Sequence, residues 1–245
     1  MDEDEYQRMI DAGERHWWYQ ASRSLLEGLI TPHLGSVDES TICLDAAGGS
    51  GATGSWLADR AMTVLDDFEL VALRAAARDH AGYRPVRADL NSLPHRNASF
   101  DAVLCVTALY HKMNPDPQAV VNEFARVTKP GGLVCLMEPG GKRLWRGHDE
   151  VTQAARRFSL ADMKSLTRAA GLDLVRATGA YSFLVPPAAL MGLVERRKNN
   201  SDVGRNESGL GGLLGQVARA ERALLRRFSL PFGLSVIAIG RKRAG

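Results

Sequence analysis

The sequence predicts an α/β protein with a doubly wound sheet, and residues 42–51 are the main reason. A short apolar run is followed by Asp45, two alanines and a glycine-rich loop. Only glycine lets the backbone turn tightly and leaves room beside it for a ligand. Residues 52–60 have the pattern of a helix start, so free backbone N–H groups would face whatever this loop holds. A strand, a glycine loop and a helix in this order form the nucleotide crevice of doubly wound sheets.

Asp45 discriminates between two ligands of such a crevice. The glycines at positions 49, 51 and 54 satisfy the dinucleotide fingerprint G-x-G-x-x-G, and Asp67 would then be the ribose acid. A dinucleotide also brings a dianionic pyrophosphate, which a carboxylate at the strand end would repel by roughly a few kcal/mol. S-adenosylmethionine brings an ammonium and a sulfonium group instead. Asp45 therefore favours S-adenosylmethionine over NAD or NADP.

The same residues resemble the first motif of the class I S-adenosylmethionine-dependent methyltransferases, an acid followed by alternating glycines. Ala47 takes the place of the family's first glycine. Asp67 ends a segment similar to the family's second strand, and it aligns with the ribose-binding acid better than Asp66 does. The other matching motifs lie at residues 86–90, 99–106, 109–111 and 129–137. The resemblance covers roughly residues 15–180 and 233–242.

This resemblance implies a Rossmann-like α/β fold. The family's sheet has seven strands in the order 3-2-1-4-5-7-6, with strand 7 antiparallel. Residues 172–177 would form the sixth strand and residues 235–240 the last. We expect a single methyltransferase domain over residues 1–245, with an N-terminal helical lid at 1–36 and a helical insertion at 182–231 before the last strand.

The resemblance also implies a set of cofactor contacts around the glycine loop. Asp89 would receive the adenine amino group, and residues 109–111 would face the methyl group. The full set around the loop is Asp45, Ala47, Gly49, Gly51, Asp67, Phe68, Asp89, Leu90 and Thr107.

An aromatic cluster at residues 14–19 precedes Arg23 on a predicted helix. Related methyltransferases often use an N-terminal helix as a lid over the cofactor, and an aromatic face near a sulfonium contributes ~0.5–2 kcal/mol. Trp18 would then contact the cofactor, and Arg23 would meet its carboxylate. Alternatively, the aromatic rings only pin the helix to the domain.

Three residues are candidates for the chemistry at the acceptor. His111 follows the fourth predicted strand, and an unperturbed imidazole pKa near 6.5 suits a general base. His148 beside Asp149 is a second candidate, provided that the two side chains touch. Tyr110 would orient the acceptor. Each of these residues could instead serve only to shape or pack the pocket.

Composition agrees with an enzyme that works without disulfides or metal. The 245 residues suffice for a full α/β core, and the three cysteines all lie in predicted strands. We interpret this as a reducing, cytoplasmic setting, since the acidic first residues do not resemble a signal peptide. Acids at positions 138, 149 and 150 are too scattered to predict a metal site.

The late part of the chain is expected to define the acceptor and other partners. Residues 177–194 carry no charge, but Pro186 and Pro187 argue against a membrane-spanning helix. Residues 210–228 have a helical apolar period beside arginines, which indicates core or lid packing or contact with an anionic membrane surface. The net charge of +3 is too small to predict nucleic-acid binding. The chain is expected to be a monomer or homodimer.

The sequence thus predicts methyl transfer from S-adenosylmethionine to a small-molecule or lipid-linked acceptor, with O-methylation and His111 as the leading version. Two alternatives stay open. One is a non-catalytic partner subunit of the same fold, motivated by Ala47 and Thr107. The other is an NAD(P)-dependent oxidoreductase, for which no Tyr-x-x-x-Lys pair is present.

Overall fold

The computed structural model describes residues 7, 10, 13, 16–38, 40–145, 147–194 and 210–244. Several sequence predictions lie outside these residues: the acidic start, Glu14 and Arg15 of the aromatic cluster, and residues 195–209 of the predicted insertion.

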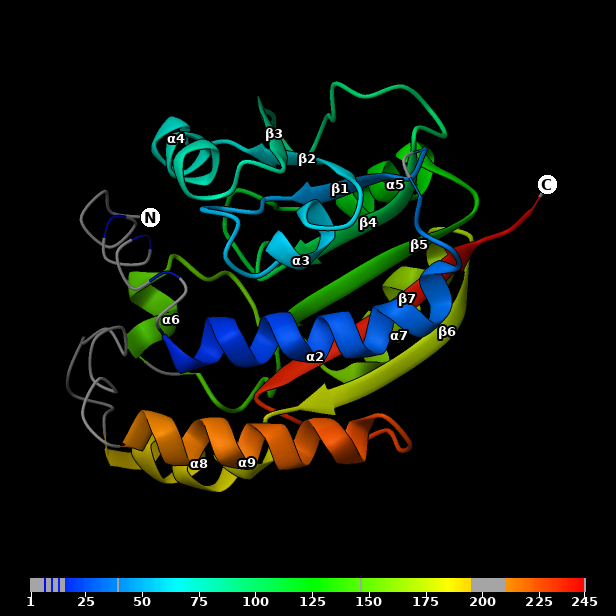
Figure 1. Cartoon of the computed structure of the whole chain (residues 1–245). Helices are drawn as coiled ribbons and strands as arrows, with labels where there is room; N and C mark the ends of the chain where they lie inside the picture. Colours follow the sequence, from blue (N-terminus) through cyan, green and yellow to red (C-terminus); the bar gives the residue numbers. More distant parts are fainter. Residues whose placement is uncertain are drawn as a thin grey trace.

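A seven-stranded sheet forms the centre of the described part (Figure 1). Its order, β3-β2-β1-β4-β5-β7-β6, confirms the predicted topology. Strand β7 pairs antiparallel with both β5 and β6, whereas the other neighbours are parallel. The strands are β1 (Ile42–Ala46), β2 (Met62–Asp67), β3 (Tyr83–Arg87), β4 (Phe100–Val106), β5 (Thr128–Pro139), β6 (Leu172–Ala180) and β7 (Ser235–Lys242).

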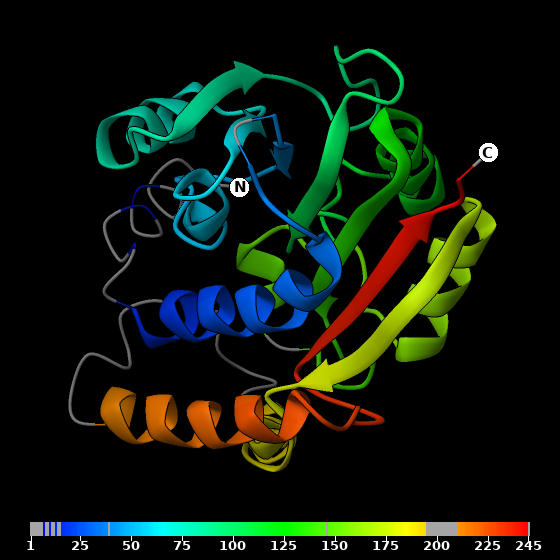
Figure 2. The same ribbon diagram turned by 45° about the vertical axis from the view of Figure 1, so that its right-hand side comes forward.

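Helices cover both faces of this sheet. The helical elements are α2 (Trp17–Leu34), α3 (Ser55–Ala58), α4 (Leu70–Asp79), α5 (Pro117–Val127), α6 (Gly147–Val151), α7 (Leu160–Ala169), the 3-10 turn η2 (Ser182–Leu184), α8 (Val185–Val194) and α9 (Leu210–Leu225). Helices α2 and α9 lie side by side in both views (Figures 1 and 2). Their buried residues share one apolar cluster with β4, β5 and β7, while α5 and α7 pack into the cluster on the opposite face.

Several local features of the elements follow from the sequence. The inner face of α2 consists of Ser22, Leu25, Leu26, Leu29 and Ile30. The capping box at the start of α7 is present, since Ser159 and Asp162 exchange side-chain to backbone hydrogen bonds. All three cysteines are buried free thiols, and burial raises the pKa of Cys43 to about 12.

Three boundaries differ from the predictions. Helix α3 has only four residues, because the chain from Gly51 to Gly54 forms turns rather than the predicted helical start. Strand β3 begins at Tyr83 and ends before Asp89, which lies in the following loop. The motif at 129–137 begins with Pro130, Gly131 and Gly132, which are typical of a turn, yet residues 129–132 lie inside β5, where the register with β4 shifts and the extra residues form an irregularity in the ladder.

The predicted insertion contains two helices that pack beside α2. Pro186 and Pro187 fall in the first turn of α8, where a missing backbone N–H removes no helical hydrogen bond. The carboxylate of Glu221 on α9 accepts from the backbone N–H groups of Tyr181 and Ser182, at 2.6 and 2.8 Å. This contact fastens α9 to the end of β6. Within the described ranges, no helix combines the length and apolarity needed to cross a membrane.

Candidate active site

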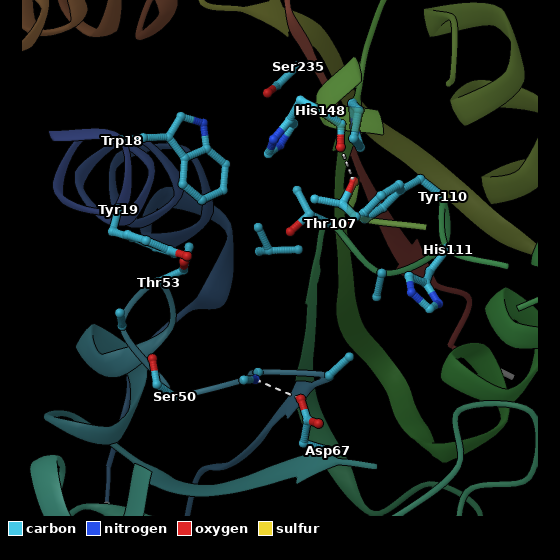
Figure 3. Close-up of a pocket in the computed structure, with 18 of the residues that line it drawn as sticks. Trp18, Tyr19, Ser50, Thr53, Asp67, Thr107, Tyr110, His111, His148 and Ser235 are labelled. Atoms are coloured by element: carbon cyan, nitrogen blue, oxygen red, sulfur yellow. Dashed lines mark hydrogen bonds between the residues drawn. The ribbon is translucent and has the colours of Figure 1, made fainter. Parts of the chain in front are cut away.

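A cavity of about 560 Å³ opens beyond the carboxyl ends of β1, β2 and β4 (Figure 3). This is where open α/β sheets bind ligands. Acids line one end of the cavity, and we call the part around Asp45, Asp67 and Asp89 the acidic end. The opposite part, the apolar end, includes His148, Leu184, Ala188 and Leu214.

Asp45 is the last residue but one of β1 and is almost completely buried. The Tyr83 hydroxyl donates to its Oδ2 atom at 2.7 Å and lies 3.1 Å from the carbonyl oxygen of Gly51. Burial raises the pKa of Asp45 to about 7, although the Tyr83 hydrogen bond acts in the opposite direction. A cationic group beside Asp45 would favour its ionised form.

Two glycines of the loop make room for this buried pair. A Cβ atom at Gly54 would lie 2.1 Å from the Asp45 carboxylate, and one at Gly51 would lie 2.4 Å from the Tyr83 ring. Gly51 also has a φ of +84°, and it does not line the cavity. Gly51 was predicted as a cofactor contact, whereas in the structure its lack of a side chain accommodates Tyr83.

Asp67 ends β2 and lines the cavity. Its Oδ2 atom accepts from the backbone N–H of Gly49 and its Oδ1 atom from that of Glu69, both at 2.9 Å. The first of these bonds is drawn in Figure 3. A carboxylate oxygen can accept more than one hydrogen bond. Asp66, by contrast, is fully buried and lies 2.8 Å from His95 Nε2.

The remaining predicted cofactor residues border the same end. Asp89 accepts from both the backbone and the side-chain nitrogen of Asn91. The Arg87 guanidinium lies 5.1 Å from the ring centroid of Phe68 and donates to its carbonyl. The predicted residues that line the cavity here are Ala47, Gly49, Phe68, Asp89, Leu90 and Thr107.

Ala47 and Thr107 share a backbone conformation that is rare for their residue types. Their φ angles are +53° and +50°, in the left-handed region that favours glycine. The N–H of Thr107 donates to the Met137 carbonyl at 2.7 Å, so the strained residue is fixed where β4 ends. Strained residues of this kind cluster at ligand sites.

The loop after Thr107 is held by one buried acid that was not predicted as a site residue. Glu138 at the end of β5 accepts from the backbone N–H groups of Ala108, Leu109 and Tyr110, at 3.0, 2.9 and 3.1 Å. Burial raises the pKa of Glu138 to about 8, and these three hydrogen bonds oppose that increase. Its position directly after an apolar strand was the available signal in the sequence.

Helix α2 supplies the aromatic wall of the cavity. Trp18 and Tyr19 lie edge to face with ring centroids 5.1 Å apart, on the opposite side from Tyr110 (Figure 3). Trp17 also borders the cavity and makes an edge contact with Tyr181. Arg23 does not line the cavity, and its Nη1 atom donates to the Ser55 hydroxyl at 3.0 Å.

The three predicted catalytic residues all line the cavity, but their environments differ. Burial raises the pKa of Tyr110 to about 12, and its hydroxyl is hydrogen-bonded to Thr152. The backbone N–H of Met113 donates to His111 Nδ1 at 3.2 Å, which places the proton of the neutral ring on Nε2. In this arrangement His111 Nε2 is a donor and not a base.

His148 projects toward the space between Trp18 and Tyr110 (Figure 3). Its carbonyl accepts from the Thr152 hydroxyl at 3.0 Å, so the contact of Tyr110 with Thr152 supports the short helix that carries it. Both oxygens of the neighbouring Asp149 accept from the Arg157 guanidinium, at 2.8 and 2.9 Å. Asp149 and Arg157 therefore form a buried, bidentate ion pair in the cavity wall.

Arg157 and Tyr83 were not predicted from the sequence. Neither follows a strand or belongs to a motif, so no pattern marked them. Among the residues that the structure describes, no group of three or more His, Cys, Asp or Glu side chains could hold a metal ion.

Comparisons with known proteins agree with this geometry. Residues 44–136 match the model of a family described as the methyltransferase domain. The bifunctional biotin-biosynthesis protein BioHC of Teredinibacter turnerae is 30% identical over 52% of this chain and 23% of its own length. The demethylmenaquinone methyltransferase of Renibacterium salmoninarum is 32% identical over 45% of this chain and 46% of its own. The ubiquinone biosynthesis O-methyltransferase of Paracidovorax citrulli is 33% identical over 61% of this chain and 55% of its own.

These matches span only about a quarter to about half of the relatives' own lengths. A solved methyltransferase in complex with the Haloferax volcanii Trm112 methyltransferase activator covers 98% of this chain and 95% of its own, with a TM-score of 0.61 at 19% identity. That likeness shows the fold. Residues 44–136 therefore match the methyltransferase domain family, and the sheet has the strand order implied by the resemblance to the class I S-adenosylmethionine-dependent methyltransferases.

Proposed function

We propose that this protein transfers a methyl group from S-adenosylmethionine to an oxygen atom of a small-molecule or lipid-linked acceptor. The observation that carries the proposal is the difference in polarity between the two ends of this cavity. Its acidic end offers carboxylates to a ligand with a ribose and a cationic amino-acid group, and its apolar end offers an imidazole amid apolar walls.

The residues of the acidic end fit S-adenosylmethionine. Asp67 would accept from the ribose hydroxyls, Asp89 would accept from the adenine amino group, and Asp45 would face the ammonium, since all three line the cavity. Thr107 and Trp18 border the space for the sulfonium. When bound, S-adenosylmethionine supplies an electrophilic methyl group. The protein then positions the two reactants, which can lower the barrier by roughly 7–11 kcal/mol.

His148 is the better placed of the two imidazoles to remove a proton from a hydroxyl acceptor. Its ring projects into the cavity, and Tyr110 and Thr152 brace its helix. For Nε2 of His111 to act as a base, the ring proton would first have to move from Nε2 to Nδ1, and the hydrogen bond from the Met113 N–H would be lost. Burial also lowers the pKa of His111. We therefore assign the base to His148, and assign Tyr110 to the support of its helix.

The acceptor is expected to be apolar and flat. Aromatic rings from α2 and apolar residues from η2, α8 and α9 border the apolar end. Two relatives are named for demethylmenaquinone methylation and for O-methylation in ubiquinone biosynthesis. A hydroxylated aromatic ring with an apolar substituent suits this lining.

Calorimetric titration with S-adenosylmethionine, S-adenosylhomocysteine and NAD tests the cofactor. Tight binding of both adenosyl ligands without NAD is expected, and binding of NAD alone would overturn the proposal. Incubation with hydroxylated quinone analogues should then yield products heavier by one methyl group. Cofactor binding without any methylated product in a broad acceptor screen would favour a non-catalytic partner subunit.

A further inference from the structure

Helix α9 has two apolar faces, and only one of them packs against the protein. Its inner face consists of Leu214, Ala218, Glu221 and Leu225, of which Leu214 lines the cavity. Its outer stripe consists of Leu213, Val217, Ala220 and Leu224, which recur at helical spacing, and continues to Phe228 just after the helix; all five residues are exposed. Leu213 and Phe228 are 57% and 61% exposed. A helix that is apolar on both faces requires a second apolar surface outside the protein.

The exposed apolar residues concentrate in this region. Eleven large hydrophobic side chains are exposed in the described part of the chain, and six of them lie between residues 190 and 232. Besides members of the outer stripe, these include Leu190 on α8 and Phe232 in the loop before β7. Helices α8 and α9 lie next to each other at the end of the molecule away from β3 (Figures 1 and 2).

The charges beside the outer stripe have one sign. Between residues 210 and 232 the only acid is Glu221, and it faces inward to the backbone of Tyr181. Arg219, Arg226 and Arg227 are exposed, and no ion pair joins them to another described residue. A helix with an apolar stripe beside arginines is typical of elements that lie in the headgroup region of anionic membranes.

The orientation of the outer stripe is fixed by the fold. Arg176 on β6 donates to the carbonyl oxygens of Leu225 and Phe228 at the end of α9, and Glu221 fastens its middle. We infer that the outer stripe and its arginines dock on an anionic lipid bilayer. An amphiphilic acceptor can then reach the apolar end past Leu214 while its tail stays in the membrane. This inference rests on the proposed function for the nature of the acceptor.

Vesicle flotation tests the docking surface. The full chain should bind vesicles containing phosphatidylglycerol and bind pure phosphatidylcholine weakly. Each arginine near an anionic membrane contributes about 1 kcal/mol, which is a factor of slightly more than five in affinity. The double variant Arg226→Gln/Arg227→Gln should therefore bind about 30-fold more weakly. Leu224→Ser/Phe228→Ser should reduce it about tenfold or more. Two variants on distant surfaces, Arg74→Gln/Arg96→Gln and Met62→Ser, are matched controls and should bind as the unmodified protein does.

Each outcome has a defined meaning. Equal binding of the Arg226→Gln/Arg227→Gln variant and its charge control would overturn the docking surface. Dimers in light scattering that dissociate in Leu224→Ser/Phe228→Ser would assign the outer stripe to a second copy of the chain. Calorimetry with S-adenosylhomocysteine on the same variants separates this from the proposed function, because none of these residues lines the cavity. Membrane docking can therefore fail while cofactor binding stays intact, and cofactor binding can fail while membrane docking stays intact.

Discussion

At the acidic end of the cavity, the ligand-facing carboxylates sit at or just beyond strand ends and are oriented by nearby backbone or by one buried hydroxyl. At the apolar end, the lining comes from α2, α6, α8, α9 and the start of β7. Asp67, held by Gly49 and Glu69, represents the first arrangement, and His148, held through Thr152 and Tyr110, represents the second. The orientation of the side chains at the acidic end depends on the sheet, whereas their position at the apolar end depends on how separate helices and loops pack. Substitutions should therefore affect cofactor binding at one end and turnover at the other.

The largest effect is expected for His148→Gln, which removes the proposed base. General base catalysis contributes about 10²- to 10⁴-fold, so kcat should fall by that range once an acceptor is known. The affinity for S-adenosylhomocysteine should stay the same, since His148 lies at the apolar end. His111→Gln is the matched control and should change kcat by only a few fold. A larger loss in His111→Gln than in His148→Gln would reverse the assignment.

Asp67→Ala tests the acidic end directly. The substitution removes the acceptors of ribose hydroxyls and also leaves the N–H groups of Gly49 and Glu69 without their carboxylate. Hydrogen bonds to a charged group contribute about 1.5–3 kcal/mol each, so the loss of two of them should raise the Kd for S-adenosylhomocysteine by more than about 100-fold. Asp79→Ala removes an exposed acid that pairs with Arg78 and should leave the Kd unchanged. Calorimetry on both variants makes the comparison.

Tyr83→Phe is expected to weaken cofactor binding in a pH-dependent way. Loss of the hydroxyl would raise the pKa of Asp45 further above its value of about 7, because this hydrogen bond favours the ionised carboxylate. Between the two pKa values Asp45 would be neutral in the variant and charged in the unmodified protein. Affinity for S-adenosylhomocysteine should therefore be about three- to tenfold weaker in that window, and the difference should shrink at lower and higher pH.

5′-Methylthioadenosine provides the control for this effect. It lacks the amino-acid group that faces Asp45, so its affinity should be the same in both proteins at every pH. An equal loss of affinity for both ligands would mean that Tyr83 supports the glycine loop as a whole. The glycine loop packs closely on Tyr83 and Asp45, since a Cβ atom at Gly51 would collide with Tyr83 and one at Gly54 with Asp45. A general effect of Tyr83→Phe on the loop is therefore a real alternative outcome.

The acidic end could be predicted from the sequence because each acid follows an apolar run at a fixed place in the chain. Asp67 is the last residue of β2 and Asp45 is the last but one of β1, and the strand order then brings them together. The helical faces of α2, α5 and α9 were predictable for a similar reason, since their apolar residues recur at a helical period.

The supporting contacts could not be predicted, because they join residues that no local pattern relates. Tyr83 reaches Asp45 across 38 residues, and Glu138 reaches the loop after β4 across about 30. Similarly, the tautomer of His111 depends on a single backbone N–H that points at Nδ1. Most of the predicted site residues line the cavity, whereas Gly51 and Arg23 do not, and the sequence contained no signal for the protonation or orientation of these side chains.

The smallest effect is expected for Ala47→Gly, and it separates backbone strain from ligand contact. A non-glycine residue in the left-handed region costs roughly 1–2 kcal/mol, and Ala47→Gly removes this strain from the folded state. The greater conformational freedom of glycine in the unfolded chain offsets part of the resulting stabilisation. The free energy of unfolding should therefore rise by up to about 1 kcal/mol. Ala98 has the same φ of +53° but lies on an exposed turn outside the cavity, so Ala98→Gly is a matched control. Denaturant titration should show similar stabilisation in both variants, whereas only Ala47→Gly should alter the Kd for S-adenosylhomocysteine. If the Kd changes in neither Ala47→Gly nor Ala98→Gly, the Ala47 side chain does not contact the cofactor, and its effect is on the backbone conformation alone.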